Sequence, residues 1–296
     1  MATTIKSTAL DFDAIKNNLK TFLEESGEFN DYNFEASGLS SILDVLAYNT
    51  HYNALTANFA LNESFLGTAQ LRSSIVALAE GIGYIPDSKT ASQSIVRLSM
   101  NLSSVPGRPN EIQIEDGFKF NTTVDETDYV FQTLEDLTAV DDGSGVYNFT
   151  DASSSRNIKI YEGVNRTKTF VALKATDNPV YIIPDKNLDI ETAVIRVYES
   201  PSSSSFITYS NLTTANVINE NSTLYILKEA PNGYFELSFG NGVTLGQAPS
   251  AGSKITLDYL SVAGASSDTA ATFSPQNQVA VNGNAYSVPV STQAKS

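Results

Sequence analysis

Residues 71–102 read LRSSIVALAEGIGYIPDSKTASQSIVRLSMNL, and a change of hydrophobic period inside this stretch decides the fold class. Over residues 71–82, apolar side chains recur at spacings of three and four, which is typical of a helix. Pro86 stops any continuation of that helix because its ring removes a backbone N–H. Over residues 96–102, apolar and polar side chains alternate, which is the period of a half-buried strand. The sequence therefore predicts helices before this point and strands after it.

Two more helices are expected upstream. The first begins after Asp11, whose carboxylate can accept backbone N–H bonds, and ends at Gly27 in a left-handed turn. Its apolar stripe consists of Phe12, Ile15, Leu19, Phe22 and Leu23. The second helix begins after Ser37 and includes the stretch LAYNTHYNAL at residues 46–55.

The second helix carries an unusually broad apolar and aromatic surface. One stripe is formed by Leu39, Ile42, Leu43, Leu46, Ala47 and Ala54. Beside that stripe lie Tyr48, His51, Tyr52 and Leu55. A helix that is apolar over more than one face usually contacts more than one neighbour. This surface is therefore a candidate for packing against a partner.

Short strand-like runs dominate the rest of the chain, separated by Gly, Pro, Asn and Asp. These runs occupy residues 94–102, 128–134, 157–161, 169–175, 180–184, 193–200, 222–229, 234–240 and 254–262. The predicted class is α+β, with an antiparallel β-rich region following the helices. We expect helices over 1–90, β structure over 91–262, and a linker with the start of a further part over 263–296.

Composition restricts the function. The chain has no cysteine, so thiolate catalysis and disulfides are excluded. Its formal charge is −15, and its 18 Lys and Arg residues form no cluster, which argues against nucleic acid as a partner. No apolar run is long enough to span a membrane, and the N-terminus does not resemble a signal peptide.

The sequence contains no strong motif for catalysis or for metal binding. His51 is the only histidine, and no Gly-x-Ser-x-Gly motif accompanies it, so we interpret it as a packed or partner-facing helical residue. We expect no catalytic residue, no metal site and no cofactor. The stretch DDGSG at 141–145 lacks the EF-hand order and predicts a hairpin turn. Asn241-Gly242 predicts a type I′ turn.

Several motifs carry a family resemblance. Residues 42–86 contain Ala-Tyr-Asn-Thr-His-Tyr-Asn, then Ala-Gln-Leu-Arg-Ser-Ser, and close with Gly-Tyr-Ile-Pro. This density resembles the helical region of the gene product 6 family of baseplate wedge proteins from T-even-like contractile-tailed phages. Residues 111–136, 158–170 and 234–268 are similar, in the same order, to the baseplate J-like part of that family. The motif residues expected at turns are Gly117, Gly163, Gly240, Asn241, Gly242, Gly246, Pro249 and Gly252.

The resemblance implies a structural protein of the virion tail baseplate, made in the host cytoplasm and matching the N-terminal half of the family. It implies pairing with itself as a dimer or ring. It also implies contacts with other wedge subunits, the sheath initiator and a wedge-bridging protein, but no nucleic acid, membrane or cofactor.

Our leading hypothesis is accordingly a wedge subunit that assembles through its helices. The candidate assembly face comprises Leu43, Leu46, Tyr48, His51, Tyr52, Leu55, Leu71, Arg72, Ile75 and Leu78. The alternative is a non-catalytic β-rich adhesin or carbohydrate-binding module, since Tyr and Asn suit saccharide contacts. A glycosidase using two of the 33 acidic residues is a third, weaker hypothesis.

Overall fold

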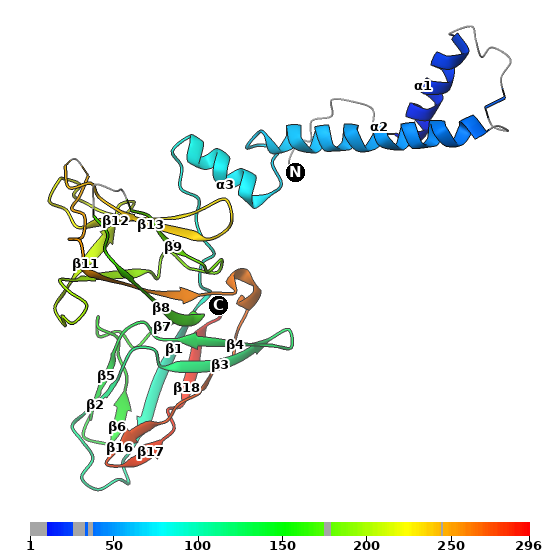
Figure 1. The fold of residues 1–296 in the computed structure, drawn as a ribbon. Coiled ribbons are helices and arrows are strands. Elements are labelled where there is room, and N and C mark those ends of the chain that lie inside the picture. Colours follow the sequence, from blue (N-terminus) through cyan, green and yellow to red (C-terminus); the bar gives the residue numbers. More distant parts are fainter. Residues whose placement is uncertain (1–10, 26–32, 35–37, 175–178, 244) are drawn as a thin grey trace. The chain divides into compact units, whose positions relative to one another are not determined.

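The computed structural model describes residues 11–25, 33–34, 38–174, 179–243 and 245–296 (Figure 1). The chain divides into two compact units, one of residues 1–86 with 230–233 and one of residues 87–229 with 234–296. Helices come first and a strand-rich region follows, so the predicted α+β class is confirmed.

The helical unit contains α1 (Phe12–Glu25), α2 (Gly38–Glu63) and α3 (Arg72–Gly81). The predicted cap of α1 is confirmed, because Asp11 Oδ1 accepts the Ala14 N–H at 2.7 Å. The predicted end at Gly27 lies outside the described residues. α1 packs against α2, and an ion pair between Lys16 Nζ and Asp44 Oδ1, at 2.5 Å, joins the two helices.

The β-rich unit consists of two lobes. We name residues 164–263 the inserted lobe, and residues 91–162 together with 264–296 the split lobe. The inserted lobe contains β8 (Val164–Val171), β9 (Tyr181–Ile183), β10 (Val194–Tyr198), β11 (Phe206–Asn211), β12 (Leu224–Glu229), β13 (Phe235–Phe239) and β14 (Lys254–Ser261). The first segment of the split lobe contains β1 (Gln93–Asn101), β2 (Glu111–Ile114), β3 (Lys119–Val124), β4 (Thr127–Gln132), β5 (Leu137–Val140), β6 (Val146–Asn148) and β7 (Ile158–Glu162). Its second segment contains the 3₁₀ turn Gly264–Ser267, β15 (Ser274–Pro275), β16 (Val279–Val281), β17 (Asn284–Tyr286) and β18 (Val290–Ala294).

Each lobe is built on a seven-stranded sheet. In the split lobe the order is β15-β3-β4-β7-β1-β18, with β6 also paired to β1. In the inserted lobe the order is β8-β14-β10-β11-β12-β13-β9. Pairing among the described strands is antiparallel except between β11 and β12, which run parallel. The prediction of an antiparallel region therefore needs correction at this one pair.

The buried side chains form a separate core in each lobe. In β1, Val96, Leu98 and Met100 are buried while the residues between them are more exposed, which confirms the predicted alternation. They belong to the core of the split lobe, and Ile195 and Leu257 belong to that of the inserted lobe.

The linker expected over residues 263–296 is corrected by the structure. β18 pairs with β1 (Figure 1), and β15 pairs with β3, so this segment completes the split lobe. Val279, Val281 and Val288 are buried in its core. The small polar residues of the segment obscured this role, because a strand at a sheet edge is held largely by backbone hydrogen bonds.

Candidate assembly surface

The helix α2 has two different apolar faces. The first is buried and includes Leu43 and Ala47, which are 2% and 0% exposed. Asn58 and Asn62 are also buried, and their side-chain amides donate to the carbonyls of the residues four positions earlier. This inner face takes part in the fold of the helical unit.

The second face of α2 is exposed, and we name it the α2 stripe. Its residues are Val45, Tyr48, Tyr52, Leu55 and Phe59, which are between 45% and 68% exposed. They follow one another at spacings of three, four, three and four. This is the pattern by which one helix packs against another in a coiled coil.

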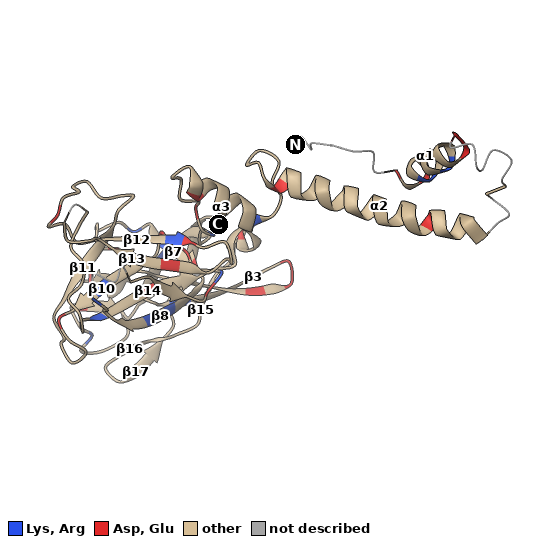
Figure 2. Cartoon of the chain, turned by 45° about the horizontal axis from the view of Figure 1, so that its top comes forward, with Lys and Arg blue, Asp and Glu red and all other residues tan. Residues whose placement is uncertain are grey.

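Charge is nearly absent from α2, as Figure 2 shows. Asp44 and Glu63 are its only charged residues. A contiguous exposed apolar patch on a soluble protein usually marks an interaction site. The α2 stripe thus has the chemistry of a helix-packing surface.

Aromatic contacts order the middle of the stripe. The rings of Tyr48 and Tyr52 are 4.8 Å apart between centroids and tilted by 49°. His51 is half-buried and meets the edge of Tyr52 at 6.2 Å between centroids. A hydrogen bond with Tyr52 raises the pKa of the Tyr48 hydroxyl above its ordinary value. The stripe is therefore preformed rather than a set of independent side chains.

The predicted assembly face divides between the two faces of α2 and the helix α3. Leu43 belongs to the buried face, whereas Leu46, Tyr48, Tyr52 and Leu55 are exposed. In α3 and just before it, Leu71 and Arg72 are exposed, and Ile75 and Leu78 are half-buried. Val45 and Phe59 were missed, although their spacing relative to Tyr48, Tyr52 and Leu55 was readable in the sequence.

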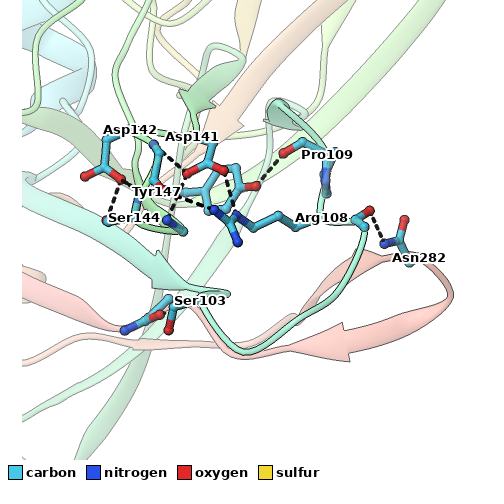
Figure 3. A network of polar contacts seen from close by, with 12 residues as sticks. Ser103, Arg108, Pro109, Asp141, Asp142, Ser144, Tyr147 and Asn282 are labelled. Atoms are coloured by element: carbon cyan, nitrogen blue, oxygen red, sulfur yellow. Dashed lines mark hydrogen bonds and ion pairs between the residues drawn. The ribbon is translucent and has the colours of Figure 1, made fainter.

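The stretch 141–145 forms the turn between β5 and β6. Figure 3 shows the polar contacts that Asp141 and Asp142 make there. Asp141 Oδ1 accepts the N–H groups of Gly143 and Gly145, both at 2.9 Å, and Oδ2 accepts Arg108 Nε at 2.6 Å. The Arg108 guanidinium lowers the pKa of Asp141 below its ordinary value. Asp142 Oδ1 accepts the N–H and hydroxyl of Ser144. These carboxylates hold a turn together, and no group of His, Asp or Glu side chains in the described residues is arranged to hold a metal ion.

The motif glycines occupy places where a side chain would be strained. Gly117, with φ of +74°, lies between β2 and β3. Gly163 lies at a bend that leads directly from β7 into β8 in the other lobe, so it is a crossing point rather than a hairpin turn.

The predicted type I′ hairpin at Asn241-Gly242 is wrong. The partners of β13 are β12 and β9, and the chain after Phe239 forms a wider loop. In that loop the N–H groups of Asn241 and Gly242 donate to the carbonyls of Leu245 and Gly246. Pro249 and Gly252 follow before β14, and Gly252 has a φ of +90°.

Comparison with known proteins shows which sequences the chain resembles. Residues 11–84 match the family model described as the helical domain of gp6-like baseplate wedge proteins. The chain is also 32% identical over 282 residues to the baseplate wedge protein gp6 of Enterobacteria phage T4. The chain is gp6-like over most of its length.

The matched region of the gp6-like chain covers 89% of its residues but 40% of the T4 protein, so the chain corresponds to part of gp6. Both matches are to baseplate wedge proteins of the gp6 type. This similarity favours the wedge-subunit hypothesis over the carbohydrate-binding alternative. Within the described residues, α1 to α3 are too short or too polar to cross a membrane.

Proposed function

We propose that the chain is a structural subunit of a phage baseplate wedge, and that the α2 stripe packs against a helix of a partner wedge subunit. The observation that carries the proposal is an exposed, uncharged stripe with alternating spacings of three and four residues. The stripe lies inside residues 11–84, the region that matches the gp6-like helical domain.

The chemistry of the stripe supports packing against apolar side chains. Leu55 and Phe59 leave nearly half of their surface in water. Burial of an apolar side chain stabilises a contact by about 1.5–3 kcal/mol when it is complete, so five half-exposed side chains give a substantial gain. Aromatic side chains are also enriched at the centres of protein interfaces.

Mixing experiments test the proposal. The chain is combined with each candidate wedge subunit and analysed by size exclusion with light scattering. We expect a larger complex with at least one wedge subunit, and self-association at high concentration is an alternative result to be distinguished by mass. A chain that stays monomeric with every wedge subunit and with itself contradicts the proposal.

A matched pair of variants locates the surface. Leu55→Glu places a charge in the α2 stripe, whereas Ala57→Glu places the same charge on an exposed part of the same helix outside it. We expect Leu55→Glu to abolish complex formation and Ala57→Glu to leave it intact, with the circular dichroism of both unchanged. Equal effects of the two variants would show that the stripe is not the contact.

The resemblance also suggests that wedges join into a ring around the hub and that the sheath initiator and the wedge-bridging protein are neighbours. We propose these contacts for the two β lobes, which lie outside the helical unit. Cross-linking of assembled wedges, with mass spectrometry of the linked peptides, tests them.

A further inference from the structure

Two buried carboxylates lie where the two β lobes meet. Glu162 is the last residue of β7 in the split lobe and is 5% exposed. Asp189 precedes β10 in the inserted lobe and is 1% exposed. Buried carboxylates are uncommon unless they have hydrogen-bond donors or an opposite charge beside them.

Each carboxylate accepts a backbone N–H from the other lobe. Asp189 Oδ2 accepts the N–H of Ala91, which leads into β1 of the split lobe, at 2.9 Å. Glu162 Oε2 accepts the N–H of Ala263, which follows β14 of the inserted lobe, also at 2.9 Å. The two hydrogen bonds therefore form a reciprocal pair across the junction.

The chain passes between the lobes at two adjacent places. One is Gly163, whose φ is +132°. A Cβ atom on Gly163 would lie 3.0 Å from both the Ser261 carbonyl oxygen and Val262 Cγ1, which belong to the second passage. Because both connections run side by side, a small rotation about them would move one lobe relative to the other, and the carboxylates would have to release their donors.

Burial of the pair favours the neutral form. Burial is the largest effect on the pKa of Glu162 and raises it, and the charge of Asp189 also raises it, whereas the Ala263 N–H and Lys89 lower it. Burial likewise raises the pKa of Asp189, although the N–H groups of Ala91, Glu191 and Thr192 lower it. No Lys or Arg of the described residues forms an ion pair with either carboxylate, since Lys89 Nζ donates to Asn187 Oδ1 instead. The other titratable groups near the junction are Glu135, Tyr161, Glu191 and Asp268.

We propose that Glu162 and Asp189 form a protonation-sensitive clasp that sets how tightly the two β lobes are held together. A neutral carboxyl still accepts an N–H through its carbonyl oxygen, but it carries neither the cost of burying a charge nor the repulsion of the second carboxylate. Both folded pKa values are raised, so the stabilising contribution is present below the ordinary carboxyl range. It is lost as pH rises through the raised values. The junction is therefore tighter below the ordinary carboxyl range and looser above the raised pKa values.

Amide hydrogen exchange of the full chain tests the clasp. The protection of the Ala91 and Ala263 N–H groups is measured by NMR across the range from pH 4.5 to 7.5 and corrected for the intrinsic exchange rate. We expect protection to fall with rising pH, by at most about tenfold per pH unit for each carboxyl that ionises. The inference is independent of partner binding, so it survives or fails separately from the proposed wedge role.

Variants separate charge from shape. Glu162→Gln and Asp189→Asn keep a carbonyl acceptor and remove the charge, so each should raise protection at neutral pH and flatten its pH dependence. Glu111→Gln, on an exposed position of β2, is the matched control and should change neither. Protection in the unmodified chain that does not vary with pH would overturn the proposal. So would amide variants that keep the original pH dependence.

One measurement needs no variant. The carboxyl carbons of Glu162 and Asp189 are titrated in the unmodified chain together with the amide shifts of Ala91 and Ala263. We expect the amides to follow the carboxyl titration. Carboxyls that ionise without any response from these two amides would show that the clasp does not exist.

Discussion

Truncating one leucine on each face of α2 gives opposite expectations for folding and for assembly. Leu43 is 2% exposed on the inner face, and Leu55 is 45% exposed in the α2 stripe. Leu43→Ala should destabilise the helical unit strongly and Leu55→Ala only weakly. In the complex with a wedge subunit, Leu55→Ala should weaken binding while leaving the fold in place.

The magnitudes follow from burial. A buried leucine replaced by alanine costs about 2–5 kcal/mol, because the lost transfer energy adds to that of the cavity left behind. Leu55 has about half of its surface removed from water already and leaves no enclosed cavity, so its loss in the free chain is about 1 kcal/mol. The exposed half is available to a partner, which gives a further loss of about 1 kcal/mol, or roughly fivefold in Kd.

Urea unfolding followed by helical circular dichroism measures the loss of stability in the free chain, because the strands contribute little to that signal. Titration of a labelled partner measures the loss of binding affinity. The reasoning fails if Leu55→Ala destabilises the free chain as much as Leu43→Ala does. It also fails if Leu43→Ala leaves the helical signal as stable as in the unmodified chain.

Three further predictions concern the β lobes. Gly240→Ala should destabilise the inserted lobe by about 1–3 kcal/mol in thermal unfolding, since its Cβ would lie 1.9 Å from the Leu245 carbonyl oxygen; an unchanged Tm would contradict the loop geometry. The pKa of Asp141 is lowered by Arg108, so its stabilising contribution is present above the ordinary value of 3.8 and lost as pH falls through the folded pKa. Asp141→Asn should therefore flatten the acid limb of a stability-versus-pH curve, and an unaltered limb would refute this. Burial raises the pKa of Tyr225 to about 12, so stability is present below the ordinary value of 10.0 and lost as pH rises through about 12; absorbance titration should show equal tyrosine ionisation near pH 10 to 11 in the unmodified chain and in Tyr225→Phe, with one additional ionised tyrosine in the unmodified chain only near pH 12, and a difference already present at pH 10 would contradict it.

The parts of the fold that the sequence predicted are those in which side-chain burial follows a simple period. β1 is one case, because Val96, Leu98 and Met100 alternate with more exposed residues. The cap of α1 is another, because the Asp11 carboxylate acts on the next turn of the same helix. In both cases the decisive interaction is local or repeats regularly along the chain.

The parts that were missed depend on a distant segment. β18 carries few apolar side chains, and its place in the sheet depends on the ladder with β1, which lies almost 200 residues earlier in the chain. Likewise, the sequence of neither strand indicates that β11 and β12 pair in parallel. Backbone hydrogen bonds are available to every residue type, so composition does not reveal them.

The candidate surface was predicted in part. Tyr48, Tyr52 and Leu55 were identified because they are aromatic or large and lie beside the main stripe of α2. The sequence could not separate them from Leu43, since nearly the whole circumference of the helix is apolar. Only the packed structure distinguishes the buried face of α2 from the face that is exposed to solvent.

The division of the split lobe into two segments has a consequence for synthesis on the ribosome. Residues 164–263 are contiguous, so the inserted lobe can complete its sheet as soon as they emerge. The split lobe must wait for β18, because the pairing partner of half of β1 lies almost 200 residues later in the chain. During this interval the edge of β1 that pairs with β18 is unpaired on a growing chain. The inserted lobe can therefore complete its sheet before the split lobe, whose two segments lie on either side of it in the sequence.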